Sequence, residues 1–224
     1  VYHPQARGAF VRRLLLLFVP LVAAHAGAQI VRHPQSMYFT EPAAWVSFGA
    51  ALSQGWTVHD GSTGSVWEFG SGTLYSASLE KTISGGTTLG LRGVTSRSPL
   101  RYTGTATGGV PTDADANVSQ LLAVLHVASG REFHSVLELS LGTTLYSNFR
   151  ARGTDVKLPP DNDPDFTFGF GYGLGYNFSP TFAIDVVQDL QTTVHQKTGL
   201  SAGEDTSIRI NSTRLIARFG LGSR

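Results

Sequence analysis

The sequence has no cysteine, a small charged fraction and, apart from one stretch near its start, no long apolar run. Without cysteine, disulfides and thiolate-bound metals are excluded. Charged residues make up 15% of the 224 residues, and the formal net charge is +1. Because proteins bind the phosphate backbone through a concentrated basic surface, this composition argues against a nucleic-acid partner.

A membrane-spanning helix is also missing, since such a helix needs about 20 consecutive apolar residues. The longest apolar run, residues 14–22, contains Pro20 and follows the basic pair Arg12 and Arg13. Small residues come after it, so the pattern predicts an export signal peptide over residues 1–28. A membrane protein with this sequence would therefore have to cross the bilayer with strands.

Glycine is abundant, with 26 residues, and the most informative segment is the glycine-rich stretch 165–178. After Asp165, its even positions are all aromatic or leucine, and its odd positions are Thr, Gly or Asn. Successive side chains of a strand point to opposite faces, so this strand has one bulky apolar face and one nearly bare face. Both faces are explained if the aromatic residues face lipid and the glycines face a narrow barrel lumen.

Strand alternation extends over the sequence that follows the signal peptide. Eight stretches have strand character: 46–54, 66–83, 87–95, 119–127, 133–149, 165–178, 182–194 and 212–222. Most of them reach the length of about 9 to 11 residues that crosses a bilayer at the usual barrel tilt. The fourth stretch is apolar on both faces and, taken alone, is also compatible with a short helix.

The connections between these strands alternate between short and long. Short links follow the second, fourth and sixth strands, and long polar links follow the others, at 56–65, 96–118, 151–164 and 196–211. Outer-membrane barrels sort their connections in this way, with tight turns at one end and long loops at the other. The sequence therefore predicts an all-β fold, an eight-stranded antiparallel up-and-down transmembrane β-barrel over residues 43–224, after a lead-in over residues 29–42.

The turn positions predict which residues face each other inside this barrel. If the sixth and seventh strands turn about Pro180, Gly175 faces Asp185 and Gly171 faces Asp189, so the bare face makes room for two carboxylates.

The hairpins of strands two and three and of strands four and five, each turned about its glycine, are predicted to place Glu80 opposite Arg92 and His126 opposite His134. The whole set of inward charges predicts a lumen ion network made of Glu80, Arg92, Glu138, Asp185, Asp189, Arg214 and Arg218, with Glu68 also facing inward.

An eight-stranded barrel is just wide enough for side chains to fill it. The network could form an ion or proton path or a carboxylate site with a shifted pKa. The favoured interpretation is that its charges neutralise one another, because unpaired buried charges are costly. The predicted histidine pair, His126 and His134, could hold a metal but lacks a third ligand. The sequence thus predicts no catalytic residue, no metal site and no cofactor.

Aromatic residues gather near the ends of the predicted strands, where a membrane barrel carries its interfacial girdles. They are Trp45, Trp56, Trp67, Phe69, Tyr146, Phe149, Phe166, Phe178, Phe182 and Phe219. An ordinary aromatic core is the alternative interpretation of the same residues.

With its export signal, eight alternating strands and alternating connections, the sequence resembles the small outer-membrane β-barrel family of the OmpA transmembrane domain and OmpX. The resemblance covers about residues 43–222 and rests on pattern. It implies a non-enzymatic bacterial outer-membrane protein that serves in envelope structure, adhesion or narrow conductance. The implied partners are outer-membrane lipids and lipopolysaccharide, the barrel assembly machinery and an extracellular ligand at the surface loops.

Two alternatives from other classes stay open. One is a lipid-modifying outer-membrane enzyme, because some small barrels of this kind act on lipid A acyl chains; a serine, a histidine and an acid near the long loops would then be catalytic. The other is a soluble periplasmic barrel of lipocalin type, whose aromatic face would point inward around an apolar ligand.

Overall fold

The strand predicted from the glycine-rich stretch is β8 (Asp165–Ser179) in the computed structural model of the chain. The structure describes residues 41–154, 156–159, 164–195 and 207–223. The predicted signal peptide and most of the lead-in lie outside these residues. Across the described part of the chain, no helix is long and apolar enough to cross a membrane.

The other elements are strands, apart from one short 3-10 helix. They are β1 (Ala44–Ser53), β2 (Trp56–Asp60), β3 (Ser65–Phe69), β4 (Gly72–Ser84), β5 (Thr87–Thr103), η1 (Thr105–Thr107), β6 (Thr112–Gly130), β7 (Phe133–Ala151), β9 (Phe182–Val194) and β10 (Ser207–Leu221).

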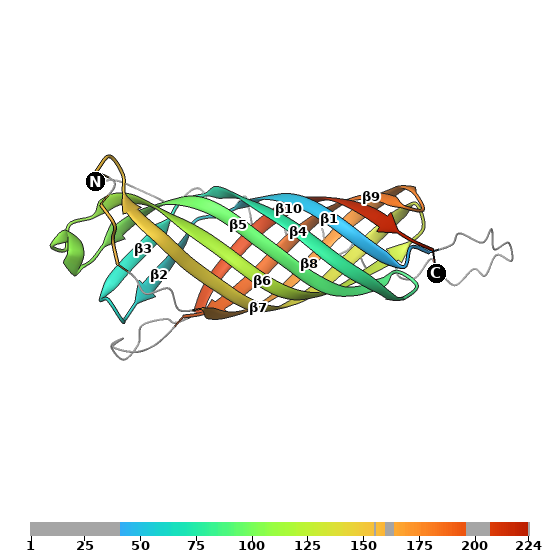
Figure 1. Ribbon diagram of the computed structural model, residues 1–224, viewed down its shortest axis with the longest axis horizontal. Coiled ribbons are helices and arrows are strands. Elements are labelled where there is room, and N and C mark those ends of the chain that lie inside the picture. The colour runs from blue at the N-terminus through green and yellow to red at the C-terminus, as the bar shows by residue number, and fades with distance from the viewer. Residues whose placement is uncertain (1–40, 155, 160–163, 196–206, 224) are drawn as a thin grey trace, which may run out of the picture. The chain divides into compact units, whose positions relative to one another are not determined.

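Eight of the ten strands close into a barrel, shown in Figure 1. The order around the wall is β1-β4-β5-β6-β7-β8-β9-β10, and β10 pairs with β1 to complete it. All neighbouring strands are antiparallel. The remaining two strands, β2 and β3, form a hairpin that extends β1 and β4 beyond the closed wall and pairs with β5 through β3. The predicted eight-stranded antiparallel barrel is confirmed.

The two ends of the barrel differ, as the connections predicted. At one end, here called the turn end, tight turns join β4 to β5, β6 to β7 and β8 to β9. At the other end, the loop end, the strands run further than predicted. Residues 56–65 are mostly strand, and the predicted loop 96–118 is reduced to 104–111, because β5 and β6 stay paired up to Tyr102 and Thr112.

Large apolar side chains are exposed on the outside of all eight wall strands. This apolar belt includes Phe48, Leu52, Tyr75, Leu79, Leu89, Leu91, Leu121, Leu137, Leu139, Leu141, Phe166, Phe168, Phe170, Tyr176, Val186, Leu190, Val194, Leu215 and Phe219. The lipocalin alternative required the aromatic face of β8 to point inward. It is wrong, because Phe166, Phe168 and Phe170 are 51%, 45% and 42% exposed.

The registers of two hairpins can be compared with the prediction. The β8–β9 register is as predicted, with Gly175 opposite Asp185. The β4–β5 register is wrong by two residues, because Glu80 lies opposite Gly90 rather than Arg92 and the ladder is irregular near the turn. A slip of two keeps each side chain on its face, so Glu80 and Arg92 are both buried inside the barrel.

The first hairpin changes faces part-way along its length. Ser53 and Trp56 both point inward, although strict alternation would put residues three apart on opposite faces, so the alternation shifts at residues 54–55. On the paired strand it shifts in the same way at residues 70–71. Pairing resumes in the same register, from Ser53 with Gly72 to Trp56 with Phe69. This double interruption explains why the prediction that Glu68 faces inward is wrong, since Glu68 is exposed on the outside.

Candidate functional site

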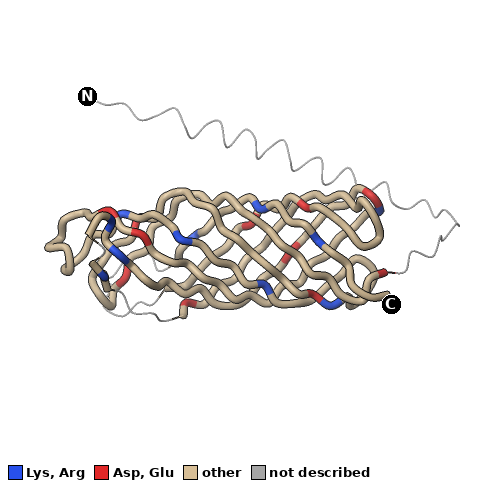
Figure 2. The backbone as a smooth tube through the Cα atoms, turned by 45° about the horizontal axis from the view of Figure 1, so that its top comes forward, with Lys and Arg blue, Asp and Glu red and all other residues tan. Residues whose placement is uncertain are grey.

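The inside of the barrel concentrates the buried charges of the protein. All seven residues of the predicted network and both predicted histidines are buried there: Glu80, Arg92, His126, His134, Glu138, Asp185, Asp189, Arg214 and Arg218. They are supplied by β4, β5, β6, β7, β9 and β10, whose alternate side chains face inward. Figure 2 shows charged positions along the length of the barrel wall.

The middle of this network is centred on Glu138. Arg92 Nη2 donates to both carboxylate oxygens of Glu138, at 2.8 Å each. Arg214 Nη2 also donates to Glu138 Oε2. The same guanidinium binds Asp189 through Nε and Nη2, at 2.8 and 3.0 Å. The result is an unbroken row of alternating charges, from Arg92 through Glu138 and Arg214 to Asp189.

The part of the network nearer the turn end is centred on Arg218. Its Nη2 donates to Glu80 Oε2 at 2.7 Å, and its Nη1 lies 3.9 Å from Asp185 Oδ2. Glu80 also accepts hydrogen bonds from Ser78 Oγ at 2.7 Å and from Thr88 Oγ1 at 2.6 Å. These neutral donors satisfy carboxylate lone pairs that would otherwise be buried without a partner.

His126 joins the two parts of the network. Its Nδ1 lies 3.0 Å from Glu138 Oε1, and its Nε2 contacts Arg218 Nη1. A guanidinium can only donate, so Nε2 accepts, and Nδ1 carries the proton that is donated to Glu138. The predicted pairing of His126 with His134 is wrong, because the β6–β7 turn lies further along the chain and His126 is opposite Glu138. His134 Nε2 instead bonds Asp185 Oδ1 at 2.9 Å.

The bare face of β8 lies against the carboxylates of this network. A Cβ atom added at Gly171 would lie 3.0 Å from Asp189 Oδ1 and 3.2 Å from Glu138 Cβ. One added at Gly175 would overlap both Asp185 Oδ1 and His134 Nε2. The glycines therefore supply the space in which the acidic side chains of β7 and β9 lie.

A neutral polar layer follows the network toward the loop end. Gln120 Nε2 donates to Thr144 Oγ1 and Gln191 Oε1, at 3.1 Å each. Thr144, Thr167 and Thr193 then continue in a row of hydroxyl contacts at 2.6 and 2.9 Å. A cavity of about 10 Å³ between this layer and the arginines has room for about one water molecule. Side chains thus fill the lumen almost completely at this level.

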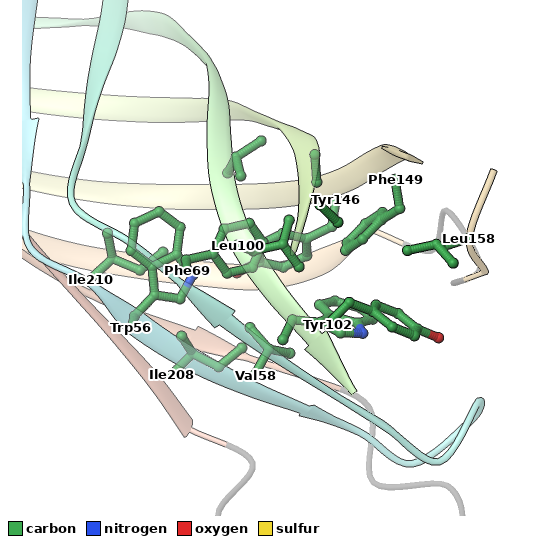
Figure 3. Packing of buried hydrophobic residues seen from close by; sticks show 14 of the residues in the cluster. Trp56, Val58, Phe69, Leu100, Tyr102, Tyr146, Phe149, Leu158, Ile208 and Ile210 are labelled. Atoms are coloured by element: carbon green, nitrogen blue, oxygen red, sulfur yellow. The ribbon is translucent and has the colours of Figure 1, made fainter. Parts of the chain in front are cut away.

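The loop end of the lumen is filled by apolar side chains, shown in Figure 3. This apolar plug consists of Trp56, Val58, Trp67, Phe69, Leu100, Tyr102, Ala114, Ala116, Val118, Tyr146, Phe149, Ala151, Leu158, Ile208 and Ile210. Trp67 is at its centre, with ring centroids 4.7 Å from Phe149 and 5.6 Å from Tyr146. Trp56 stacks on Phe69 at 4.7 Å.

The plug corrects the predicted aromatic girdle. Trp56, Trp67, Phe69, Tyr146 and Phe149 are buried inside the barrel and do not face the outside. Of the remaining predicted girdle residues, Phe166, Phe178 and Phe219 are exposed, and Phe182 and Trp45 are half-buried. The ring centroid of Trp45 lies 5.0 Å from the guanidinium carbon of Arg218.

Beside the plug lies an ionic latch made of Asp60, His195 and Asp165. His195 Nδ1 is 2.6 Å from Asp165 Oδ2, and its Nε2 is 3.6 Å from Asp60 Oδ1. Asp165 lies one residue beyond Phe166, the last belt residue of β8, and His195 lies one residue beyond Val194, the last of β9. Both are therefore on the loop side of the apolar belt. Burial opposes a charged imidazole, but the two carboxylates outweigh it and raise the pKa of His195 to about 9.

The latch also holds the tip of the β2–β3 hairpin. Asp60 accepts hydrogen bonds from Ser62 N at 3.0 Å and from Ser62 Oγ at 2.7 Å, and Thr63 Oγ1 donates to its second oxygen. Burial would raise the pKa of Asp60, but the nearby imidazole of His195 and the hydrogen bonds from Thr63 and Ser62 lower it below its usual range. The hairpin tip is thereby tied to β8 and β9.

Sequence reasoning missed this latch. Asp165 and His195 continue the inward alternation of Thr167 and Thr193, so the period of two carried a signal for both. The sequence carried no signal for the third member, Asp60, because the direction of its side chain depends on the change of faces at residues 54–55. In the part of the chain that the structure describes, no group of three or more histidine, cysteine, aspartate or glutamate residues is arranged to hold a metal ion.

Comparison with known proteins identifies the fold but no family. No family model matches the sequence, and no curated protein matches it. Among solved structures, neisserial surface protein A is 14% identical, with a TM-score of 0.51 over 80% of this chain and 97% of that chain. Ail of Yersinia pestis is 17% identical, with a TM-score of 0.39 over 80% and 99% of the two chains. OprG of Pseudomonas aeruginosa is 10% identical, with a TM-score of 0.43 over 81% and 96%.

At 14% identity, the match to neisserial surface protein A shows a shared fold. Together with the closed wall of eight antiparallel strands, it confirms the resemblance on which the prediction rested. The chain has the fold of the small eight-stranded outer-membrane β-barrels.

Proposed function

We propose that this chain is an integral bacterial outer-membrane β-barrel that acts without catalysis, as a closed structural barrel that presents its loop end as an interaction surface. The apolar belt carries the proposal. Every wall strand exposes large apolar side chains on the outside, while six of the eight, β4, β5, β6, β7, β9 and β10, bury ionisable side chains of the network on the inside. In water this exposed apolar area would destabilise the barrel, because apolar surface is transferred out of water favourably. In a bilayer the same arrangement is the stable one.

A closed lumen is the second part of the proposal. The ion network, the neutral polar layer and the apolar plug follow one another along the barrel, and each is made of side chains that contact across the lumen. Such packing among the described residues supports a lumen without a continuous water-filled path for ions. The narrow-channel role is therefore not the one we favour.

The loop end supports the interaction role. Here the strands continue beyond the belt around the apolar plug, so the loops stand on a packed base. The outside of this extension is polar and charged, as at Glu68, Arg97 and Arg101. This is the pattern of a surface in contact with water, and it suits contact with partners outside the membrane.

The lipid-modifying enzyme is the alternative that needs its own test. Each buried histidine has a carboxylate partner: His126 with Glu138, His134 with Asp185, and His195 with Asp165. Such partners suit ion-pair packing as well as catalysis, so an activity assay decides between the two functions. An assay for acyl release from purified lipid A should detect none with the refolded protein.

Cell fractionation tests the location, and planar-bilayer recording tests the closed lumen. We expect the protein in the outer-membrane fraction, with a gel mobility that changes on heating because the folded barrel resists detergent. We expect no stepwise conductance from the refolded protein. Recovery in the soluble periplasmic fraction would overturn the membrane assignment, and steady single-channel currents would overturn the closed lumen.

A further inference from the structure

The charges of the lumen network do not balance when only its carboxylates and arginines are counted. Four described acids are buried in the network against three described arginines: Glu80, Glu138, Asp185 and Asp189 against Arg92, Arg214 and Arg218. One negative charge is left over, in a space where a charge without a counter-ion is costly. Among the described residues of the network, the two histidines, His126 and His134, are the other groups that can carry a positive charge.

His126 does not supply the missing positive charge. Its Nε2 contacts Arg218 Nη1, and a guanidinium can only donate, so this ring nitrogen carries no proton of its own. The proton of the ring is on Nδ1, which donates to Glu138 Oε1 at 3.0 Å. His126 is therefore a neutral bridge between two charged residues and leaves the balance unchanged.

The unbalanced carboxylate is Asp185. Each of the other three acids accepts a hydrogen bond from at least one guanidinium: Glu80, Glu138 and Asp189. Arg218 Nη1, in contrast, lies 3.9 Å from Asp185 Oδ2, which is beyond hydrogen-bonding distance. This oxygen is buried, and no described residue forms a hydrogen bond with it. Asp185 thus has the weakest arginine contact of the four acids.

His134 is placed to compensate Asp185. Its Nε2 lies 2.9 Å from Asp185 Oδ1, and the two side chains are 2% and 0% exposed. Gly175 of β8 lies against both groups, because a Cβ atom added there would overlap Asp185 Oδ1 and His134 Nε2. The bare face of β8 therefore leaves the imidazole as the group that contacts this carboxylate most closely.

The other ionisable groups around the pair are already bound to different partners. Arg218 of β10 donates to Glu80 of β4 at 2.7 Å, and His126 of β6 bridges Arg218 and the middle of the network. The inward side chains of β1 near this level are Trp45, which lies over the Arg218 guanidinium, and Ser47, and neither of them ionises. The charge at Asp185 is therefore left to His134.

We propose that His134 and Asp185 form a proton-binding site, and that the proton held there at neutral pH is the fourth positive charge of the lumen network. A neutral imidazole beside an ionised carboxylate has a total charge of −1, and one added proton brings the pair to zero, whichever of the two side chains carries it. Loss of this proton leaves a buried negative charge, so proton binding is coupled to the stability of the closed barrel. The site goes beyond the interaction role proposed above and does not depend on it.

A pair of variants tests whether a second substitution repairs the damage of the first. His134→Gln keeps an amide that can donate to Asp185 but cannot hold the extra proton. The ratio of folded to unfolded protein should fall on the order of a hundredfold, because one buried charge has lost its counter-ion. Adding Asp185→Asn removes that charge, so the double variant should regain most of the loss. Urea unfolding at neutral pH, after refolding into phosphatidylcholine vesicles, measures both changes.

His126 and Glu138 provide the matched control, since they are also a buried histidine and carboxylate of the lumen. His126 is neutral, and Glu138 is the shared partner of Arg92 and Arg214. Adding Glu138→Gln to His126→Gln should therefore lower stability further. Rescue in the first pair of variants and none in the second is the pattern that the proton-binding site requires.

Nuclear magnetic resonance of the wild type gives a readout that does not depend on whether a variant folds. The ring nitrogens of His134 are identified by the signals lost in His134→Gln, or in the double variant if the single one does not fold, and the carboxyl carbon of Asp185 by those lost in the double variant. At neutral pH we expect either both ring nitrogens protonated, or one protonated nitrogen beside a protonated Asp185.

Two results would overturn the proposal. One is a neutral His134 ring beside an ionised Asp185 in the wild type, which would leave the fourth positive charge to another cation. The other is a double variant no more stable than His134→Gln, as loss of packing alone would produce. A His134→Gln protein that fails to fold while the double variant folds supports the site, whereas failure of both contradicts the rescue.

Discussion

Arg92 on β5 donates to both carboxylate oxygens of Glu138 on β7, at 2.8 Å each, past the strand β6 that lies between them in the wall. The two side chains meet inside the lumen and not along the wall. Contacts of this kind hold non-adjacent strands together, so the network should contribute to the stability of the closed barrel as a whole.

Replacing Glu138 with Gln should destabilise the barrel strongly. The change removes the carboxylate shared by Arg92 and Arg214 and leaves buried positive charge without its counter-ion. Breaking a buried pair from one side costs about 3 to 5 kcal/mol. Urea unfolding of the protein refolded in vesicles measures the loss. Glu68→Gln, at an exposed position, is the control and should change stability little. An unchanged midpoint for Glu138→Gln would contradict the assignment.

A double-mutant cycle should resolve which charges are coupled. Asp189 bonds Arg214 through two hydrogen bonds, whereas Arg218 pairs with Glu80. Asp189→Asn with Arg214→Met should show a coupling of about 0.5 to 3 kcal/mol, as contacting residues do. Asp189→Asn with Arg218→Met should be closer to additive. The free energies of unfolding of the wild type, the three single variants and the two double variants decide the matter, and equal coupling in both cycles would contradict the specific pairing.

Gly175→Ala should cost stability, in contrast to the same change at Gly93. A Cβ at Gly175 overlaps Asp185 Oδ1 and His134 Nε2, whereas a Cβ at Gly93 meets no atom within 4 Å. Overpacking costs about 1 to 3 kcal/mol. Replacing an unhindered strand glycine with alanine is neutral or gains roughly 0.5 to 1 kcal/mol. Chemical unfolding of both variants, side by side, checks the opposite signs. Equal effects would mean that the bare face of β8 is not filled by the neighbouring acids.

Trp67→Ala should loosen the loop end while the membrane part stays folded. Trp67 is 1% exposed at the centre of the plug, and truncating such a ring costs about 3 to 5 kcal/mol. Limited proteolysis should then cleave the strands beyond the belt, and the heat-modifiable gel shift should persist. Tyr75→Ala, which alters an exposed belt residue, should leave the protease pattern unchanged. Resistance of Trp67→Ala to protease would show that the plug is not needed to hold the loop end.

The ionic latch should weaken at alkaline pH. The pKa of His195 is raised from 6.5 to about 9, so the folded state binds the proton more tightly than the unfolded state does. The stabilisation is complete below about pH 6.5 and is lost as pH rises through about 9. Protease cleavage at the hairpin tip should be faster at pH 10 than at pH 7 in the wild type. In His195→Gln the rate should be high at both values, and a pH-independent wild type would rule the latch out.

The parts of the fold that alternation alone determines could be predicted from the sequence. The β8–β9 register was correct because Pro180 marks the turn and the glycines leave one plausible inner face. The β4–β5 and β6–β7 registers were wrong by even numbers of residues, since several turn positions are compatible with the same sequence. Even slips preserve the faces, and this is why Glu80 and His126 were still placed inside.

The loop end was the part that could not be predicted. A strand with a polar outside and an apolar inside has the same period as one with the reverse arrangement, so alternation does not say where the membrane ends. Trp67 and Leu79 are both at odd positions of the predicted strand 66–83, so unbroken alternation would put them on one face. The shift at residues 70–71 instead buries Trp67 in the plug and leaves Leu79 exposed in the belt. The sequence carried no signal for the latch residue Asp60, because its direction depends on the matching shift at residues 54–55.

The double interruption of the first hairpin also constrains how its sequence can change. The shifts at residues 54–55 and 70–71 lie opposite each other, and the register is the same on both sides of them. Deleting one residue from only one of the two strands would reverse the faces of that strand, so that its inward side chains point outward, while the paired strand would keep its faces. Related chains should therefore gain or lose the two irregularities together, so that changes at the two sites are correlated.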